Sequence, residues 1–289
     1  MPDIAFQHLE INGRRLRVAS VGQGRPLLLL HGWPEYWLTW RPVMLRLADR
    51  FRLIAPDLRG FGGSALSDET PSAAVGAEVH AADMAGLMDR LALEGVGIVS
   101  HDVGAYVAQL LALQQPHRLA GLFFFNCPYP GIGGRWAVPD HLKEIWYQSF
   151  NQLPWAASLI GASRESCRLF VRHFLQHWSH RKTAFDDVLE EWVDMFLQPG
   201  VLQGGFNWYL SANAARLAIM KGEAPARPPI GVRTCVRWGA EDPVCRIEWS
   251  DRLGEFFTDL DAMPFPDVGH FPHHEDPDRA AQEVAAFFR

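Results

Sequence analysis

The segment spanning residues 96–105 places a carboxylate where a nucleophile could act. Its first residues predict a buried strand and its last residues open a helix, so the chain turns sharply between them. A nucleophile on such a turn needs small residues two positions before and two positions after it. Centring the turn on Asp102 puts Ser100 and Gly104 there, whereas centring it on Ser100 would need Ile98. The steric rule therefore favours Asp102 as the nucleophile, although an aspartate here could also only cap the helix.

Two later loops offer an acid and a base. Asp242 follows a predicted strand at residues 234–238, and His270 follows the next predicted strand. The order Asp102, Asp242, His270 is the nucleophile, acid, histidine order of enzymes built on such a turn. Asn126 ends the strand at 119–125 and carries no carboxylate, which leaves Asp242 as the better acid. Without the other motifs, Asp242 would be interpreted as a turn residue and His270 as a loop histidine with no catalytic role.

The loop His31–Glu35 ends another predicted strand and could bind a developing negative charge. In enzymes with this turn, one backbone N–H comes from that loop and a second from the residue after the nucleophile. These donors would be the N–H groups of Trp33 and Val103. The proline in the loop predicts a fixed bend that a cis bond would suit. The glycine-rich run at 57–64 is interpreted as a tight turn without a chemical role.

Alternating strands and helices must position these loops. The predicted elements are a hairpin at 4–10 and 16–21, strands at 26–30, 51–55, 96–99, 119–125, 234–238 and 261–265, and helices at 37–47, 106–113, 247–257 and from 279. This alternation predicts an α/β protein with a mostly parallel sheet and helices on both faces. It stops between residues 127 and 227, where helical stretches such as 142–150 and 167–178 follow one another. We expect a core of residues 1–126 and 228–289 and an inserted helical cap of residues 127–227.

The bulk composition excludes several classes of protein. The chain has 289 residues, 48% of them hydrophobic, and a net charge of −6, so we expect one large globular domain, or a core with an insertion, and no nucleic-acid partner. No apolar run is long enough to span a membrane and no targeting segment is recognisable, so the expected location is the cytoplasm. The four cysteines lack metal-binding spacing, and we expect free thiols, no metal and no cofactor. His173 and His177 are interpreted as cap-surface residues, and His273 and His274 as the solvated start of a helix.

Taken together, the motifs at 31–35, 57–64, 101–104 and 269–270 resemble those of the epoxide hydrolase and haloalkane dehalogenase branch of the α/β-hydrolases, and epoxide hydrolases most. The resemblance implies two cap tyrosines that act as acids, and Tyr147 and Tyr209 lie in similar contexts. It also implies that an epoxide is opened to a vicinal diol through an ester on Asp102, which water activated by His270 then hydrolyses.

The cap supplies candidate substrate contacts. These are Trp146, Gln148, Phe150, Trp155 and Trp208. We expect them to line a cavity for a small apolar epoxide in a monomer or homodimer. A dehalogenase is the alternative, but Val103 stands where haloalkane dehalogenases hold the halide with a tryptophan. A non-catalytic ligand-binding protein on the same fold is the second alternative.

Overall fold

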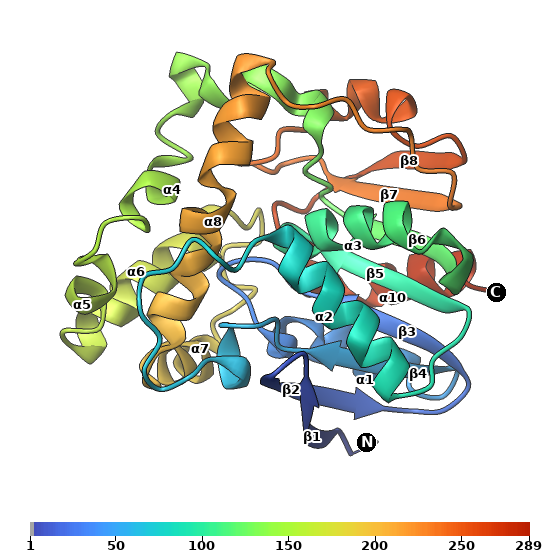
Figure 1. The fold of residues 1–289 in the computed structure, drawn as a ribbon, viewed down its shortest axis with the longest axis horizontal. Helices are drawn as coiled ribbons and strands as arrows, with labels where there is room; N and C mark the ends of the chain where they lie inside the picture. Colours follow the sequence, from blue (N-terminus) through green and yellow to red (C-terminus); the bar gives the residue numbers. More distant parts are fainter. Residues whose placement is uncertain (1–2) are drawn as a thin grey trace.

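A single eight-stranded sheet organises the protein, whose computed structural model describes residues 3–289 (Figure 1). The strands are β1 (Ala5–Ile11), β2 (Arg14–Val21), β3 (Arg25–Leu30), β4 (Phe51–Pro56), β5 (Val96–His101), β6 (Leu119–Phe125), β7 (Thr234–Gly239) and β8 (Leu260–Phe265). Their order is β1-β2-β4-β3-β5-β6-β7-β8. β2 pairs antiparallel with β1 and β4, and the remaining pairs are parallel. The predicted α/β class with a mostly parallel sheet is confirmed.

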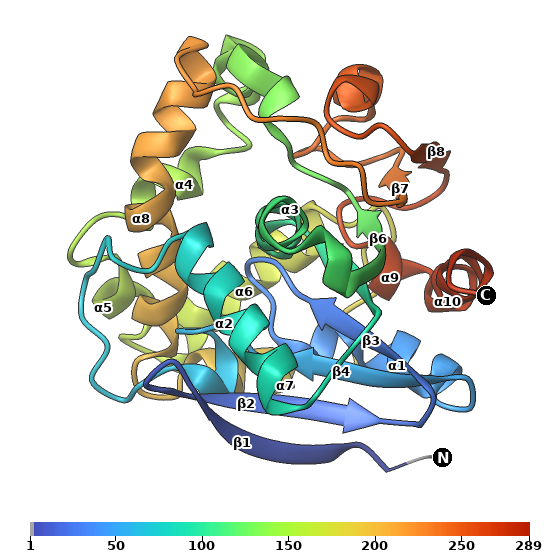
Figure 2. The ribbon, with the colours of Figure 1, turned by 45° about the vertical axis from the view of Figure 1, so that its right-hand side comes forward.

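Helices cover both faces of this sheet, which explains why its central strands are almost wholly apolar. α2 (Ala77–Arg90) and α3 (Val103–Gln114) pack together on one face (Figure 2). α1 (Arg41–Leu47), α9 (Pro272–Glu275) and α10 (Pro277–Phe287) pack together on the other. α2 is not among the predicted elements, because its buried side includes alanine, histidine and aspartate as well as methionine and leucine, which weakens the apolar periodicity.

Between β6 and β7 the described chain is helical and contains no strand. Its elements are the 3-10 helices η4 (Pro130–Ala137) and η5 (Pro139–His141) and the helices α4 (Trp146–Phe150), α5 (Ala156–Ile160), α6 (Arg164–His177), α7 (Leu189–Phe196) and α8 (Val201–Lys221). In Figure 1 they form a separate group beside the sheet. We call residues 127–227 the cap segment. The helix expected near 247–257 is the 3-10 helix η6 (Ile247–Glu255).

Close contacts seat the cap segment on the core. Gly204 of α8 touches Gly60 so closely that a Cβ at position 204 would lie 2.0 Å from the Gly60 carbonyl oxygen. The indole N–H of Trp192 in α7 donates to the Pro34 carbonyl at 2.9 Å. The glycine-rich run at 57–64 thus packs against a cap helix as well as forming a turn. None of the described helices is long and apolar enough to cross a membrane.

Candidate active site

Asp102 occupies a sharp turn between β5 and α3. Its backbone has φ 47° and ψ −113°, a conformation that costs a non-glycine residue energy and is retained at functional turns. A Cβ at Gly104 would lie 2.3 Å from the Leu30 carbonyl oxygen, and one at Gly32 would lie 2.5 Å from the Asp102 Cβ. Only glycine therefore allows the turn to approach β3 and the loop after it. The backbone here has the form that presents a nucleophile.

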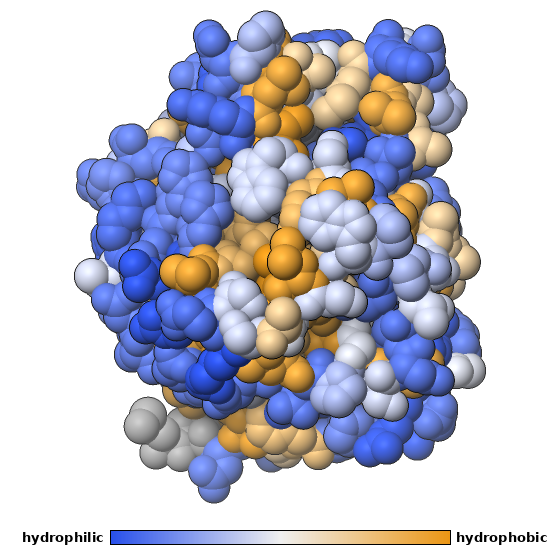
Figure 3. Space-filling model, turned by 90° about the vertical axis from the view of Figure 1, so that its left-hand side faces the viewer, coloured by the Kyte–Doolittle hydropathy of each residue, from blue (hydrophilic) through white to orange (hydrophobic). Residues whose placement is uncertain are grey.

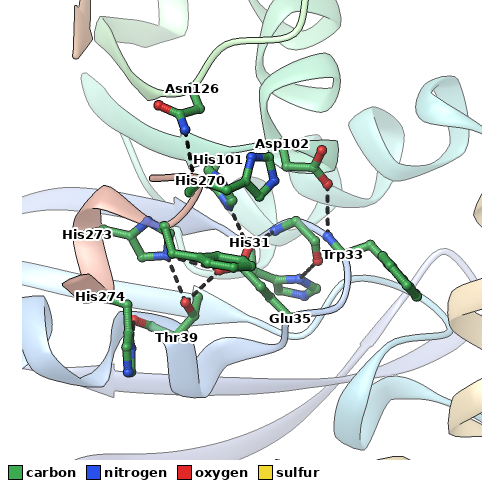
Figure 4. A network of polar contacts seen from close by, with 12 residues as sticks. His31, Trp33, Glu35, Thr39, His101, Asp102, Asn126, His270, His273 and His274 are labelled. Carbon is green, nitrogen blue, oxygen red and sulfur yellow. Dashed lines mark hydrogen bonds and ion pairs between the residues drawn. The ribbon is translucent and has the colours of Figure 1, made fainter. Parts of the chain in front are cut away.

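The loop after β3 donates a hydrogen bond to this carboxylate. The Trp33 N–H lies 2.9 Å from Asp102 Oδ1, and the Trp33–Pro34 peptide bond is cis (Figure 4). Val103 opens α3 directly after Asp102, and the first N–H groups of a helix have no acceptor within it. Of the two predicted oxyanion donors, the Trp33 N–H contacts the Asp102 carboxylate, and the Val103 N–H belongs to the next residue of the chain.

His270 and Asp242 form a buried pair. His270 Nδ1 lies 2.8 Å from Asp242 Oδ2, and the ring is fully buried. The backbone N–H groups of Val244 and Cys245 donate to the other carboxylate oxygen, at 2.7 and 3.0 Å. His270 Nε2 has no hydrogen-bond partner among the described residues. One ring nitrogen is thus oriented by the acid, and the other can exchange a proton.

Asn126 connects the acid to the histidine loop, a role that the sequence analysis missed. Its amide N–H₂ donates to Asp242 Oδ2 at 2.7 Å and to the carbonyls of Gly269 and His270 at 3.0 and 3.1 Å. Its side-chain oxygen accepts from the Gly239 N–H at 2.5 Å. An amide both donates and accepts, whereas a carboxylate only accepts. The absence of a carboxylate at the end of β6 was the available signal, and it served only to exclude Asn126 as the acid.

The protonation of His270 depends on the surrounding carboxylates. Burial by itself lowers the pKa of this imidazole, but the charge and hydrogen bond of Asp242, with a further contribution from Asp102, raise it to about 9. The free enzyme at neutral pH therefore holds a protonated His270 near the Asp102 carboxyl group.

The two predicted cap tyrosines lie together against Trp33. The Tyr147 ring stacks on the Trp33 ring at 4.9 Å between centroids, and the Tyr209 ring lies 5.5 Å from that of Tyr147. Burial raises the pKa of both phenols well above 10, and the nearby Asp102 charge raises it further. Both phenols are therefore protonated at neutral pH and can donate a hydrogen bond close to the proposed nucleophile.

The other predicted cap contacts do not gather there. Trp146 and Trp155 are 42% and 51% exposed. Figure 3 shows one face of the molecule, on which apolar side chains lie between hydrophilic ones. Phe150 packs between these two indoles, and Trp208 lies beside His80, 5.8 Å between ring centroids. Both rings are therefore partly exposed to solvent, and their role as substrate contacts stays a prediction.

Gln148, the one predicted cap contact that is not aromatic, lies beside Tyr147. Its amide donates to the Tyr147 hydroxyl at 3.3 Å and accepts from Arg216 at 2.6 Å. It thus adjoins one of the two candidate acids. The sequence offers no signal for the contact with Arg216, because 68 residues separate them.

A buried network behind the nucleophile was also missed. Glu35 accepts from the Gly32 N–H at 2.7 Å and from the Thr39 hydroxyl at 2.6 Å, and its oxygens lie 2.7 and 3.0 Å from ring nitrogens of His101 and His273 (Figure 4). Burial alone would raise the pKa of Glu35, yet the two rings hold it well below its usual value. This anion fixes the loop that carries Trp33 and braces His101, whose ring lies 4.6 Å from that of His270.

His273 and His274 are buried, which corrects their interpretation as a solvated helix start. His273 contacts Glu35, and His274 stacks on Phe185 of the cap segment at 3.9 Å. His173 and His177 are both exposed, and His177 contacts Glu144 at 2.6 Å. Glu35, His101 and His273 are close enough to share a cation, but their atoms already contact one another at hydrogen-bond distance. The four cysteines are free thiols and are buried.

Comparisons with known proteins agree with the fold described above. The model of a family described as the alpha/beta hydrolase fold matches residues 25–277. A soluble epoxide hydrolase of Corynebacterium sp. is 29% identical over 99% of this chain and 98% of its own length. An epoxide hydrolase 1 of Siraitia grosvenorii is 40% identical over 72% of each chain. The solved structure of the epoxide hydrolase CorEH without ligand superposes with a TM-score of 0.83, at 24% identity and over 99% of both chains, and so supports the fold.

Proposed function

The chain belongs to the alpha/beta hydrolase fold family and is similar to its epoxide hydrolases, and from this premise we propose that it opens epoxides to vicinal diols through an ester on Asp102. The observation that supports this most is the pair of protonated phenols, Tyr147 and Tyr209, near the Asp102 carboxylate. An oxirane oxygen leaves as a strongly basic alkoxide, and a phenol with a pKa near or above 10 is a suitable acid for it.

In the first step, Asp102 attacks a carbon of the oxirane. Its Oδ1 is held by the Trp33 N–H, and Oδ2 accepts no hydrogen bond from the described residues, so Oδ2 forms the new C–O bond. The carbon–oxygen bond of the ring breaks, and the oxygen takes a proton from Tyr147 or Tyr209. A carboxylate suits this chemistry because the resulting ester can be hydrolysed at its carbonyl carbon.

In the second step, His270 first loses to solvent the proton that it carries in the free enzyme. Water then attacks the Asp102 carbonyl carbon while the neutral His270 Nε2 accepts the proton of that water. The charge that develops on the carbonyl oxygen is stabilised by the N–H groups of Trp33 and Val103. When the tetrahedral intermediate collapses, the diol oxygen takes the proton from His270 and leaves Asp102 as a carboxylic acid. This acid returns its proton to His270, and the tyrosinate regains, through solvent, the proton that His270 lost before the attack of water. Asp242 keeps the imidazole in the required tautomer and stabilises its protonated form.

The covalent step can be tested by blocking hydrolysis. His270→Gln should retain attack by Asp102 but not hydrolyse the ester. Intact-protein mass spectrometry after incubation with a reactive epoxide should then show one adduct with the mass of the substrate, on the peptide that contains Asp102. Asp102→Asn is the matched control and should show no adduct.

Heavy-oxygen water separates this route from direct attack by water. In a single turnover of the wild-type enzyme, the diol should contain unlabelled oxygen from Asp102, because the labelled water enters at the ester carbonyl. Label that appears in the diol of the first turnover would instead make Asp102 a general base or a helix cap, and the proposal would be wrong.

Dehalogenation is the second candidate, and one observation favours it. The indole N–H of Trp33 is buried without a hydrogen-bond partner among the described residues and could hold a halide. Val103, by contrast, offers no side-chain N–H. We expect bromoalkanes to release bromide much more slowly than epoxides are hydrolysed, and fast release would reverse the ranking. Tight binding of epoxides without turnover would instead indicate a non-catalytic ligand-binding protein.

A further inference from the structure

Arg216 places a positive charge on the cap helix that also carries Tyr209. It lies on α8 seven residues after Tyr209, so the two side chains leave the same face of the helix about 10 Å apart along its axis. Its Nη1 donates to Gln148 Oε1 at 2.6 Å and its Nη2 to Asn213 Oδ1 at 3.1 Å. The side chain is half-buried.

The described part of the chain provides no anion for this cation. No carboxylate of the described residues 3–289 lies within ion-pair distance of Arg216, whose two acceptors are neutral amide oxygens. The titratable groups that influence it are the phenols of Tyr106, Tyr147 and Tyr209. All three phenols are neutral at neutral pH, because burial raises their pKa values. An arginine remains protonated, so a half-buried charge is left unpaired.

A single amide group separates this charge from a proposed catalytic acid. Gln148 contacts Arg216 through its oxygen and the Tyr147 hydroxyl through its nitrogen, at 2.6 and 3.3 Å. Two hydrogen bonds and one amide place the guanidinium within about 8 Å of that hydroxyl. In a substrate whose oxirane oxygen is bound by Tyr147, a chain of a few carbon atoms is therefore long enough to extend from the ring to Arg216. A guanidinium has five N–H groups, and the two that are used leave three for a ligand.

We propose that Arg216 is a specificity-determining residue that binds a carboxylate of the substrate, so that the preferred substrates are epoxy acids with the carboxylate a few carbon atoms from the ring. This inference rests on the proposed epoxide hydrolysis and narrows the small apolar epoxide of the sequence analysis to an anionic one. A carboxylate matches the planar guanidinium and would form charge-assisted hydrogen bonds with it. The cation would also offset the repulsion between an anionic substrate and Asp102.

The test compares two substrates of the same shape and different charge, 5,6-epoxyhexanoate and 5,6-epoxyhexanamide. The wild-type enzyme should have a kcat/KM for the carboxylate at least about tenfold above that for the amide, since hydrogen bonds to charged groups contribute more than neutral ones. Arg216→Gln should lower kcat/KM for the carboxylate by about 10- to 100-fold and for the amide by less than about threefold. Arg216→Lys keeps the charge and should retain part of the preference.

Arg172→Gln is the matched control, because it removes the same charge from an exposed position on cap helix α6. It should leave both rates unchanged. Equal wild-type rates on the two substrates would overturn the inference. An equal loss on both substrates in Arg216→Gln would also overturn it, because Arg216 would then only position Tyr147 through Gln148.

These outcomes differ from failure of the proposed function. If the amide is hydrolysed without a preference for the carboxylate, only the specificity inference fails. If no epoxide is hydrolysed and His270→Gln forms no adduct, the proposed function fails and the inference fails with it. If Arg216→Gln does not fold, inhibition of the wild-type enzyme decides: hexanoate should compete with the substrate and hexanamide should not, and equal inhibition would overturn the inference.

Discussion

His270 can act as a base only when it is neutral, and its charge depends on Asp102. In the free enzyme the anionic Asp102 helps to raise the pKa of His270 to about 9. Formation of the ester removes the charge of Asp102 and with it one of the causes of that shift. The imidazole therefore loses its proton more easily at the stage at which it must activate water. Hydrolysis thus needs the neutral imidazole, whereas the free enzyme at neutral pH holds the protonated one.

Histidine titration by NMR should show these contributions separately. Asp102→Asn, which imitates the neutral ester, should lower the pKa of His270 from about 9. Asp242→Asn should lower it further than Asp102→Asn does, because Asp242 opposes the effect of burial more strongly than Asp102, through both its charge and its hydrogen bond. An unchanged pKa in Asp102→Asn would contradict this account. Where hydrolysis limits kcat, the rate should rise with pH through a pKa below 9.

The two phenols should share the protonation of the leaving oxygen. Tyr147→Phe and Tyr209→Phe should each lower the rate of ester formation by about 10- to 100-fold, and the double variant by at least about 1000-fold, as expected for a positioned acid. Stopped-flow measurement of adduct formation in a His270→Gln background isolates this step. Circular dichroism should show unchanged folding. A double variant with unimpaired activity would contradict the proposed epoxide hydrolysis and favour dehalogenation.

Helix α8 holds Tyr209 in place through its contact with the loop after β4. Two adjacent glycines of this helix differ sharply in their surroundings. A Cβ at Gly204 would lie 2.0 Å from the Gly60 carbonyl oxygen, whereas one at Gly205 would lie 3.6 Å from the Trp33 ring, which is ordinary contact. The approach of α8 to the core therefore depends on one glycine and not on its neighbour.

Gly204→Ala should shift α8 away from the core, lower stability by about 1–3 kcal/mol and reduce activity. Gly205→Ala is the control and should be neutral, or stabilising by up to about 1 kcal/mol, because alanine favours the helix. Urea denaturation and epoxide turnover measure both effects. Equal results for the two variants would show that the Gly60 contact does not position the cap helix.

The molecule as a whole buries several neutral histidines, and acid should destabilise it for that reason. Burial lowers the pKa of His80 to about 3, and that of His31 and His273 to about 4. These groups bind protons below pH 6.5 in the unfolded chain but not in the native state, so their contribution to stability falls as pH falls through that range. Asp57 acts in the opposite direction, since burial raises its pKa to about 6.

His80→Phe isolates one of these protons. Neither ring nitrogen of His80 has a hydrogen-bond partner among the described residues, so the substitution removes no such contact. Between pH 6.5 and 5, the free energy of unfolding of the wild type should fall by about 2 kcal/mol more than that of the variant. Urea titrations at the two pH values measure the difference. Parallel loss in both proteins would show that His80 is not buried in its neutral form.

Order along the chain was enough to predict the mostly parallel sheet and to propose the residues at the ends of its strands. Parallel strands end at one edge of a sheet, so Asp102, Asp242, His270 and the Trp33 loop could be placed together without knowledge of the packing. The small residues around Asp102 also indicated the nucleophile position, because the sharp turn excludes larger residues there. The structure brings these four together and leaves their roles to the experiments above.

Only the tertiary structure decided which face of each helix turns inward and which distant residues meet. Trp208 and Tyr209 are neighbours in α8, yet one lies beside His80 and the other beside Tyr147. The contacts that join Glu35 to His273 and Arg216 to Gln148 link residues far apart in sequence. A side-chain pattern gives the spacing of residues on one element, but its orientation depends on the packing of neighbouring elements, and buried polar groups find their partners only in that packing.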